Sequence, residues 1–462
     1  MAELKLNKKD IIWSYIAQFL SMGAGALTLP FILNKLSTAE IGFNYILLTV
    51  GSVIALVDLG FAPQFARNFT YVLSGVQELR KEGVGETDKE INYGLLAYLL
   101  TTARYVYAVL AVFALILLIV VGTPYIYKTT DGFTAVPNAQ WVWLIYSLGV
   151  LFQIFYSYYF SMLLGAGKIK EQKYAVIGNK LLYIIILISG LYMDWGLLSI
   201  ALAQLISPFF GRFLSHRYFY TPELVERLSA HPKRERSKII EIFNILWYNA
   251  KRLAVMQIGG YAIVKFNMFI AGLFISLDEF ASYGLMVQLL GIISTLACTY
   301  LQISQPKFAS LRASKNDDGL LRSFSFSQNI FYVLFIACSV ILVVFGQGML
   351  DIIKSNATLP SQLILTVYCI VIFLESNHSN FAVLISSNNN IPFAPASITT
   401  GIAVCIGTFF VVRYTDLGIL GLVIVQGICQ AAYQNWKWPL VALDEFHISF
   451  FKLMKMGIPS HR

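Results

Sequence analysis

Four titratable side chains lie deep inside apolar stretches of this 462-residue chain: Lys265, Glu375, His378 and Asp58. A charged group at the centre of a bilayer costs about 2.5–3.5 kcal/mol on insertion scales, so each one needs a partner, a wet cavity or a route to the interface. Groups that are kept at such a cost are the first candidates for binding an ion or a charged substrate.

Lys265 is the deepest cation. It follows Lys251 by fourteen residues and precedes Ser276 by eleven, which is roughly 21 Å and 16 Å along a helix. Its side chain cannot comfortably reach either surface, so it either lines an aqueous cavity or pairs with a buried acid. A hydrated ammonium at mid-depth suits phosphate oxygens.

Glu375 opens a polar run that ends at Asn380 and interrupts an otherwise apolar stretch. His378 is three residues further on, hence on the same helix face, and histidine titrates near physiological pH. The two side chains could share a proton and couple transport to an ion gradient. The alternative is an interhelical cluster whose hydrogen bonds are all satisfied.

Asp58 and Arg67 are nine residues apart, which places them on opposite helix faces, so Asp58 needs another partner. We interpret Asp58 as a packing residue or a further ion-coupling candidate. Arg67, Arg104, Lys180 and Arg212 fall near predicted cytoplasmic ends of apolar stretches. Their long side chains either snorkel to the surface or contact substrate from the cytoplasmic side.

The elements that carry these residues are predicted to be transmembrane helices. Hydrophobic residues make up 57% of the chain, charged residues 13%, and the mean hydropathy is +0.67, whereas soluble domains are about 25% charged. Twelve apolar runs are long enough to cross a bilayer core of about 30 Å. Their approximate ranges are 11–33, 42–62, 99–121, 141–164, 174–192, 196–215, 253–275, 280–303, 325–346, 362–386, 393–412 and 416–436.

Most of the 34 lysines and arginines fall in segments on one side of these spans. Cytoplasmic loops retain positive charge, so both termini are predicted to be cytoplasmic. The net charge of +9 reflects this bias, and no nucleic-acid partner is expected. The loops that fall outside contain only these four: Lys35, Lys128, Lys354 and Arg413.

Motifs for enzyme chemistry are missing from the sequence. Gly165–Ile169 lacks the spacing and the Ser/Thr of a phosphate-binding loop, and no zinc-protease or hydrolase motif is present. The five cysteines lie in apolar spans without metal or disulfide spacing. We therefore expect no enzyme, no cofactor and no ATP site, and transport that draws on a gradient.

Segments of the first half recur in order in the second half. A duplicated transporter has two similar lobes, with the substrate held between them. At the last offset, Glu375 corresponds to Gln153, so the copies differ in charge there. The matched segments are Ser37–Ile41 with Ser276–Phe280 (offset 239), Pro63–Ala66 with Pro306–Ala309 (243), and Asp194, Gly196, Leu198 and Gln204 with Asp416, Gly418, Leu420 and Gln426 (222).

The predicted domains are an N-terminal six-helix lobe (1–216), a cytoplasmic linker (217–252), a C-terminal six-helix lobe (253–436) and a basic amphipathic tail (437–462). Helix-start signals at Thr221–Glu223 and Ser237 predict interfacial helices in the linker. The basic faces of linker and tail either lie on anionic lipids or remain solvated.

The run Leu29–Pro30, Leu36–Gly42, Asp58–Phe61 and Arg67 resembles the opening of Wzx-type polysaccharide flippases, and Ser276–Leu289 resembles their second-half copy. The resemblance implies a MATE-like fold of the multidrug/oligosaccharidyl-lipid/polysaccharide (MOP) superfamily, with two pseudo-symmetric six-helix bundles.

The implied function is alternating-access transport of undecaprenyl-diphosphate-linked oligosaccharides to the outer leaflet of the bacterial inner membrane, for O-antigen, capsule or exopolysaccharide synthesis. A glycan polymerase and a chain-length regulator become candidate partners. The family's cationic cavity suits Lys265, Arg67, Arg104 and Lys180 as diphosphate contacts, whereas Glu375 departs from a purely cationic lining.

Two other functions stay open. A MATE-type multidrug or cation antiporter of the same fold would favour a more acidic, aromatic cavity. A membrane glycosyl polymerase or ligase usually has a large outside loop with paired acids or arginines, and the longest outside loop predicted here, 123–139, is too short.

Overall fold

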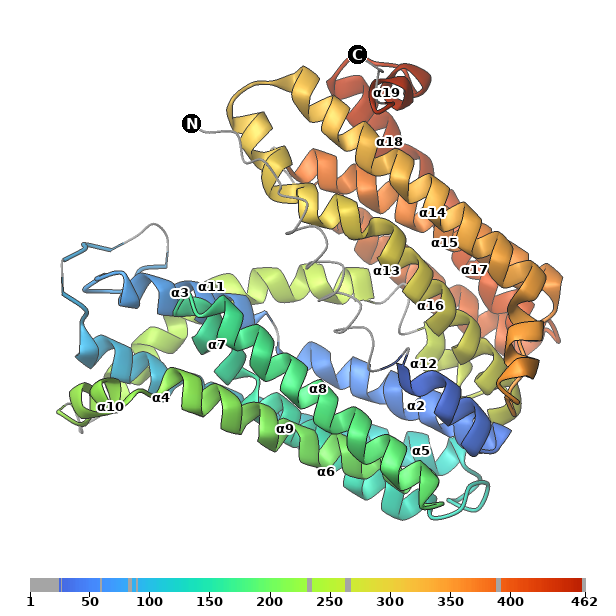
Figure 1. The fold of residues 1–462 in the computed structure, drawn as a ribbon, viewed down its shortest axis with the longest axis horizontal. Coiled ribbons are helices and arrows are strands. Elements are labelled where there is room, and N and C mark those ends of the chain that lie inside the picture. Colours follow the sequence, from blue (N-terminus) through green and yellow to red (C-terminus); the bar gives the residue numbers. More distant parts are fainter. Residues whose placement is uncertain are drawn as a thin grey trace. The chain divides into compact units, whose positions relative to one another are not determined.

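The protein is helical throughout the residues that the computed structural model describes: 25, 27–58, 60–81, 85–88, 90–230, 235–261, 267–387 and 392–458. Within these ranges the β pairing is limited to an isolated antiparallel bridge between Val76 and Thr87. The predicted all-α class is confirmed (Figure 1).

The helices are listed here with the labels of Figure 1. In chain order they are α2 (Thr38–Ile54), η1 (Ala55–Asp58), α3 (Phe61–Leu73), α4 (Tyr93–Leu117), η2 (Leu118–Gly122), α5 (Thr123–Thr129), α6 (Ala139–Tyr156), α7 (Tyr158–Gly165), α8 (Ile169–Tyr192), α9 (Leu198–Phe219), α10 (Pro222–Ser229), α11 (Arg236–Tyr261), α12 (Asn267–Ala271), α13 (Leu277–Ala313), α14 (Asp317–Ile352), α15 (Gln362–Ser386), α16 (Ala394–Tyr414), α17 (Gly418–Ala431), α18 (Gln434–Glu445) and α19 (Phe450–Met456).

Nine helical stretches of the described chain are long and apolar enough to cross a membrane. The predicted spans 11–33 and 253–275 fall partly outside the described residues. The count of twelve spans and the cytoplasmic termini therefore stay predictions. The segment predicted as an interlobe linker contains α10 and most of α11.

Contacts divide the chain into two compact units. We call Ile46–Ile258 the N unit, and Met1–Tyr45 together with Gly259–Arg462 the C unit. The first helical residues of the chain are thus grouped with its second half. Asn34 Nδ2, for example, donates to the backbone oxygen of Ile353 at 3.1 Å.

The sequence repeat is visible in how matched helices begin. Ser37 Oγ accepts from the backbone N–H of Glu40 at 3.3 Å, and Ser276 Oγ accepts from that of Glu279 at 3.2 Å. These caps satisfy first-turn donors that have no partner within a helix. They lie 239 residues apart, at the offset read from the sequence.

Helices α4 and α14 also begin alike. Asn92 Oδ1 accepts from Leu95 N at 2.9 Å, and Asn316 Oδ1 accepts from Gly319 N at 2.9 Å. These two asparagines are 224 residues apart. The offset aligns α4 with α14 residue by residue, which matters for the charges described below.

The 222-residue offset is reproduced in the backbone. Gly196 and Gly418 both adopt left-handed conformations, with φ of 55° and 52°, which glycine allows without steric cost. At this offset α6 and α7 match α15, α8 matches α16, and α9 matches α17 with α18.

The copies differ most at α2 and α3. The 3₁₀ segment η1 and the left-handed Gly60, with φ of 73°, separate the two helices, whereas the matching α13 runs unbroken for 37 residues. The prediction of one continuous span over 42–62 is therefore wrong. The interruption places Asp58 at a helix break.

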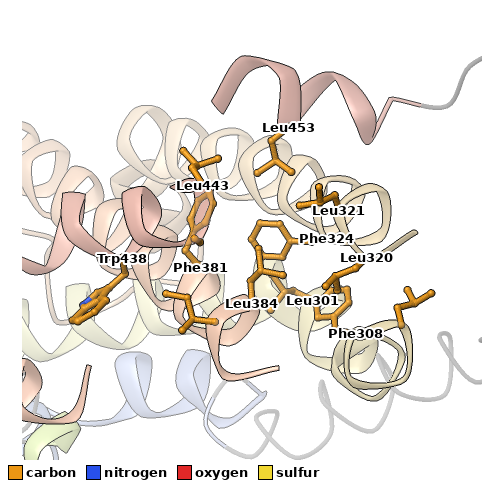
Figure 2. Close-up of a cluster of buried hydrophobic side chains, with 13 residues drawn as sticks. Leu301, Phe308, Leu320, Leu321, Phe324, Phe381, Leu384, Trp438, Leu443 and Leu453 are labelled. Atoms are coloured by element: carbon orange, nitrogen blue, oxygen red, sulfur yellow. The ribbon is translucent and has the colours of Figure 1, made fainter. Parts of the chain in front are cut away.

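The core of the C unit includes a cluster of large apolar side chains from α13, α14, α15 and the last two helices (Figure 2). The rings of Phe324 and Phe381 lie 5.2 Å apart. Leu453 of α19 is fully buried in this cluster, and Asn329 Nδ2 donates to Met454 O at 3.0 Å. One face of the predicted amphipathic tail is therefore packed on protein, while Phe451 remains exposed.

Candidate functional site

The largest described cavity of the N unit has a volume of about 740 Å³ and lies among α4, α6, α7 and α9. Two arginines and a histidine contribute its cationic and titratable groups. We call it the arginine cavity. Its polar and aromatic lining residues are Thr101, Arg104, Tyr105, Phe155, Tyr156, Tyr158, Tyr159, Arg212, His216 and Tyr220.

Aromatic rings surround the basic groups of this cavity. The guanidinium carbon of Arg212 lies 5.3 Å from the ring centroid of Tyr156, and the rings of His216 and Tyr220 are 4.6 Å apart. Such a ring face attracts a guanidinium. Among the described residues that line the cavity, none is acidic. The arrangement can hold an anionic group beside apolar ring faces.

The junction between α6 and α7 places the tyrosines. Ser157 turns its backbone N–H and its hydroxyl back onto Ile154 O, at 3.1 Å and 2.8 Å. A serine that bonds back in this way interrupts the regular helix ladder. Tyr156, Tyr158 and Tyr159 thereby all reach the arginine cavity, although they are nearly consecutive in the sequence.

A second cavity of the N unit, about 420 Å³, is lined by Asp58, Lys180, Gln153, Gln204 and Tyr146, among others. We call it the polar cavity. One carboxylate, one ammonium and two primary amides meet in it, so it carries hydrogen-bonding groups of both kinds.

Asp58 is held firmly at the helix break. Its Oδ1 accepts from the hydroxyl of Tyr107 at 2.7 Å, and its Oδ2 accepts from the backbone N–H of Ala62 at 3.2 Å. The partner required by the sequence argument is thus Tyr107 rather than Arg67.

Lys180 is half-buried and forms no ion pair with the described residues. It lies eleven residues into α8, roughly 16 Å from the start of that helix. Beside it in the polar cavity, Gln204 Nε2 donates to Gln153 Oε1.

In the C unit, amides from α17 hold Glu375. Its Oε2 accepts from Gln426 Nε2 at 3.0 Å and from Gln430 Nε2 at 2.9 Å. The buried His378 has a different partner: its Nδ1 pairs with Asn435 Oδ1 at 2.9 Å. Both side chains belong to an extended interhelical network of amides.

The rest of the polar run in α15 is also bonded. Asn377 Oδ1 accepts from Gln328 Nε2 at 2.9 Å and from the hydroxyl of Tyr332 at 2.7 Å. Asn380 Nδ2 donates to Gln328 Oε1 at 3.1 Å. Ser376 Oγ lies 2.7 Å from Ser294 Oγ. This network joins α15 to α13 and α14.

The repeat relates the hydrogen bond between Gln153 and Gln204 to the one between Glu375 and Gln426. Each member of the second pair follows its counterpart by 222 residues. The same two helices are therefore joined at the same place by two amides in the N unit and by an amide and an acid in the C unit. A carboxylate is not needed to make this joint.

The cavities are related in the same way. A smaller cavity of the C unit, about 260 Å³, is lined by residues that follow those of the arginine cavity by 222 positions. The paired positions are Tyr156 with His378, Arg212 with Gln434, and His216 with Trp438. At the 224-residue offset, Arg104 corresponds to Gln328. Both arginine positions of the N unit thus hold glutamine in the C unit.

The structure therefore groups the predicted site residues differently from the sequence. Arg104 lies with Arg212, and Lys180 lies with Asp58. Arg67 is exposed, donates to Gln64 Oε1 at 2.6 Å and lies outside both described linings.

Lys265 lies outside the described residues. Sequence reasoning missed the grouping of His216 with the tyrosines, although the aromatic run Phe155–Phe160 was a visible signal. It also missed Gln430 and Asn435, the amides that hold Glu375 and His378.

Neither a family model nor a curated protein sequence matches the chain. Solved structures do. The chain is similar to a multidrug resistance MATE family transporter of the MOP superfamily in an inward-facing conformation, with 11% identity, a TM-score of 0.65 and coverage of 95% of each chain. It is also similar to the lipid II flippase MurJ in an inward closed conformation, with 13% identity, a TM-score of 0.67 and coverage of 96% of this chain and 90% of that one.

A MOP superfamily transporter from Pyrococcus furiosus is similar too, with 12% identity, a TM-score of 0.53 and coverage of 97% and 96%. Identities this low establish the fold. The predicted MATE-like fold of the MOP superfamily, a multi-pass transporter fold, is confirmed. The narrower resemblance to Wzx-type flippases stays a prediction.

Proposed function

We propose that this protein is a flippase that moves undecaprenyl-diphosphate-linked oligosaccharides from the cytoplasmic to the outer leaflet of a bacterial inner membrane. The observation that carries the proposal is the arginine cavity. It combines Arg104, Arg212 and His216 with several tyrosines, and its described lining contains no carboxylate.

The chemistry of the cavity suits a lipid-linked diphosphate. A guanidinium offers a planar fork of donors that matches phosphate oxygens, and hydrogen bonds between charged groups are about twice as strong as neutral ones. Tyrosine rings offer apolar faces and hydroxyl groups beside that charge. A cavity of about 740 Å³ has room for a headgroup larger than a single phosphate.

The internal repeat argues that these cations serve function rather than folding. The positions of Arg104 and Arg212 are occupied by Gln328 and Gln434 in the C unit, which forms the same helices without those charges. Cations inside a membrane protein are costly. Their retention in one unit is explained if that unit binds the anionic part of the substrate.

The remaining predicted residues take supporting roles in this proposal. Lys265 and Arg67 would contact the diphosphate at other stages of alternating access. Glu375 and His378, with Asp58 as a further candidate, would couple transport to an ion gradient. The basic linker and tail would rest on anionic lipids, and a glycan polymerase and a chain-length regulator would receive the product.

A MATE-type cation antiporter is the second candidate. The buried acids Asp58 and Glu375 favour it, because an organic cation needs a carboxylate partner. A known MATE transporter also shares the fold. The two candidates differ in the sign of the charge that the substrate carries.

Reconstituted transport decides between them. The full-length protein in proteoliposomes should translocate undecaprenyl diphosphate that carries a short glycan, and Arg104→Gln with Arg212→Gln should abolish this. Arg217→Gln is the matched control, because Arg217 is exposed in the last turn of α9 and lies outside the described cavity lining. If these arginines can be removed without loss, and the chain protects a pump-deficient host against cationic drugs, the antiporter is correct.

A further inference from the structure

The polar cavity lies close to the arginine cavity but has different chemistry. The two cavities share α6 and α9: Gln153 and Gln204 line one, and Tyr156 and Arg212 line the other. Gln204 precedes Arg212 by eight residues, which is about 12 Å along α9. A ligand whose charged group occupies the arginine cavity would therefore have its neighbouring chemical groups near the polar cavity.

The polar cavity offers donors and acceptors in balance. Asp58 is an acceptor, Lys180 is a donor, and Gln153 and Gln204 carry both kinds of group. One acid and one ammonium leave no net charge among these four. Such a set fits a neutral ligand with many hydroxyl groups, because every hydroxyl both donates and accepts a hydrogen bond.

Asp58 is preorganised for this task. Tyr107 and the backbone of Ala62 each donate one hydrogen bond to its carboxylate. A carboxylate has about four lone-pair sites, so two bonds fix its position and leave acceptor capacity for a ligand. The break between α2 and α3 brings its carboxylate to the lining.

Neither charge of the polar cavity is required by the fold. Lys180 corresponds to Ile402 at the 222-residue offset, and Ile402 is 54% exposed. Asp58 lies between segments matched at 239 and 243 residues, and both offsets lead to apolar residues, Ala297 and Leu301. The second copy thus builds the same helices with apolar side chains at these positions.

We propose that the polar cavity is a sugar-binding site, which takes a neutral sugar of the lipid-linked glycan while the arginine cavity takes the diphosphate. This inference rests on the proposed function and extends it. Recognition of the glycan then resides in the N unit, in groups distinct from those that hold the phosphates.

The test compares binding of two kinds of lipid to the purified full-length protein. The nanodiscs contain phosphatidylglycerol and phosphatidylcholine. The ligands are bare undecaprenyl diphosphate and the same lipid carrying glucose, galactose or N-acetylglucosamine. Dissociation constants come from competition against radiolabelled undecaprenyl diphosphate. The variants are Asp58→Asn, which keeps size and the acceptor for Tyr107, and Lys180→Ile, which copies the residue of the second unit.

We expect at least one sugar to tighten binding of the diphosphate lipid to the unchanged protein. Either variant should reduce that gain about tenfold, as expected for the loss of a hydrogen bond to a charged group. Binding of the bare lipid should stay within about twofold, which also shows that the variants are folded. Lys173→Ile, an exposed position on α8, should retain the whole gain.

Three results would overturn the inference. If no sugar in the set tightens binding, or if both variants keep the gain, the cavity does not read sugar, while the proposed function stands as long as the bare lipid binds through the arginines. If phosphatidylethanolamine in place of phosphatidylcholine abolishes the gain, the cavity binds a zwitterionic lipid headgroup instead. If neither lipid binds the unchanged protein, the proposed function fails together with the inference.

Discussion

Replacing Glu375 with glutamine should leave the protein as stable as before, or slightly more stable, and should remove the dependence of transport on pH. The N unit supplies the precedent. Gln153 occupies the matching position and bonds to Gln204, as Glu375 bonds to Gln426. The substitution therefore copies a joint that the fold already contains.

The magnitude follows from the contacts of the carboxylate. Glu375 accepts two amide hydrogen bonds, from Gln426 and Gln430. A bond to a charged group contributes about 1.5–3 kcal/mol and a neutral bond about 0.5–1.5 kcal/mol, so two bonds would weaken by about 2–3 kcal/mol in total. Removing the charge from the membrane recovers a similar amount, about 2.5–3.5 kcal/mol.

A buried acceptor beside Glu375 tips the balance. Gln430 Oε1 is buried and has no hydrogen-bond partner among the described residues. A glutamine at position 375 brings an amide N–H₂ group that can donate to this oxygen, which the ionised carboxylate cannot do. Leaving such an acceptor unsatisfied costs about 1–3 kcal/mol, so the variant should gain part of that amount.

Two measurements check this prediction. Thermal unfolding of the purified variant should give a midpoint equal to or above that of the unchanged protein. Glycan export, measured across a pH series at matched protein abundance, should fall or lose its pH dependence. A lowered unfolding midpoint together with normal export at every pH would refute the reasoning, because Glu375 would then be a structural acid. His378→Gln, which keeps an amide partner for Asn435, is the companion variant.

Three further predictions concern other parts of the chain. Lys265→Ala should abolish glycan export at normal abundance and Lys265→Arg should retain part of it; full export by the alanine variant would remove the residue from the mechanism. A reporter fused after Asn389 should read cytoplasmic, because the flanking predicted spans fix its side, and an outside signal would show that the count of spans is wrong. Gly42→Ala should lower the unfolding midpoint, by about 1–3 kcal/mol in stability, because its new Cβ would lie 2.0 Å from Leu277 O. Gly291→Ala, with no atom within 4 Å of its Cβ, is the control and should be tolerated.

The sequence predicted the helical class and the repeat because both depend on patterns that short segments carry. Apolar run lengths report membrane helices, and cap residues such as Ser37 and Ser276 mark matched helix starts. The interruption at η1 escaped prediction. An apolar run has the same composition whether or not the helix breaks within it, and Gly60 alone does not reveal a left-handed turn.

The candidate site was less predictable, because it depends on which helices meet. Depth along a span identified Lys180, Arg104 and Glu375 as costly charges, but depth does not give partners. Arg104 and Arg212 come from helices more than 100 residues apart in the sequence and line one cavity. The amides that hold Glu375 are uncharged, so an inventory of intramembrane charges passed over them.

The unequal distribution of charge between the two copies is the strongest guide to mechanism. A duplicated fold provides its own comparison, since positions matched at 222 and 224 residues share helices but not side chains. Arg104, Arg212 and Lys180 are cationic only in the first copy, and Glu375 is acidic only in the second. Because each of these charges is costly and its counterpart shows that the fold forms without it, each requires a functional explanation. Binding of an anionic lipid-linked sugar by the first copy, and ion coupling by the second, accounts for both sets.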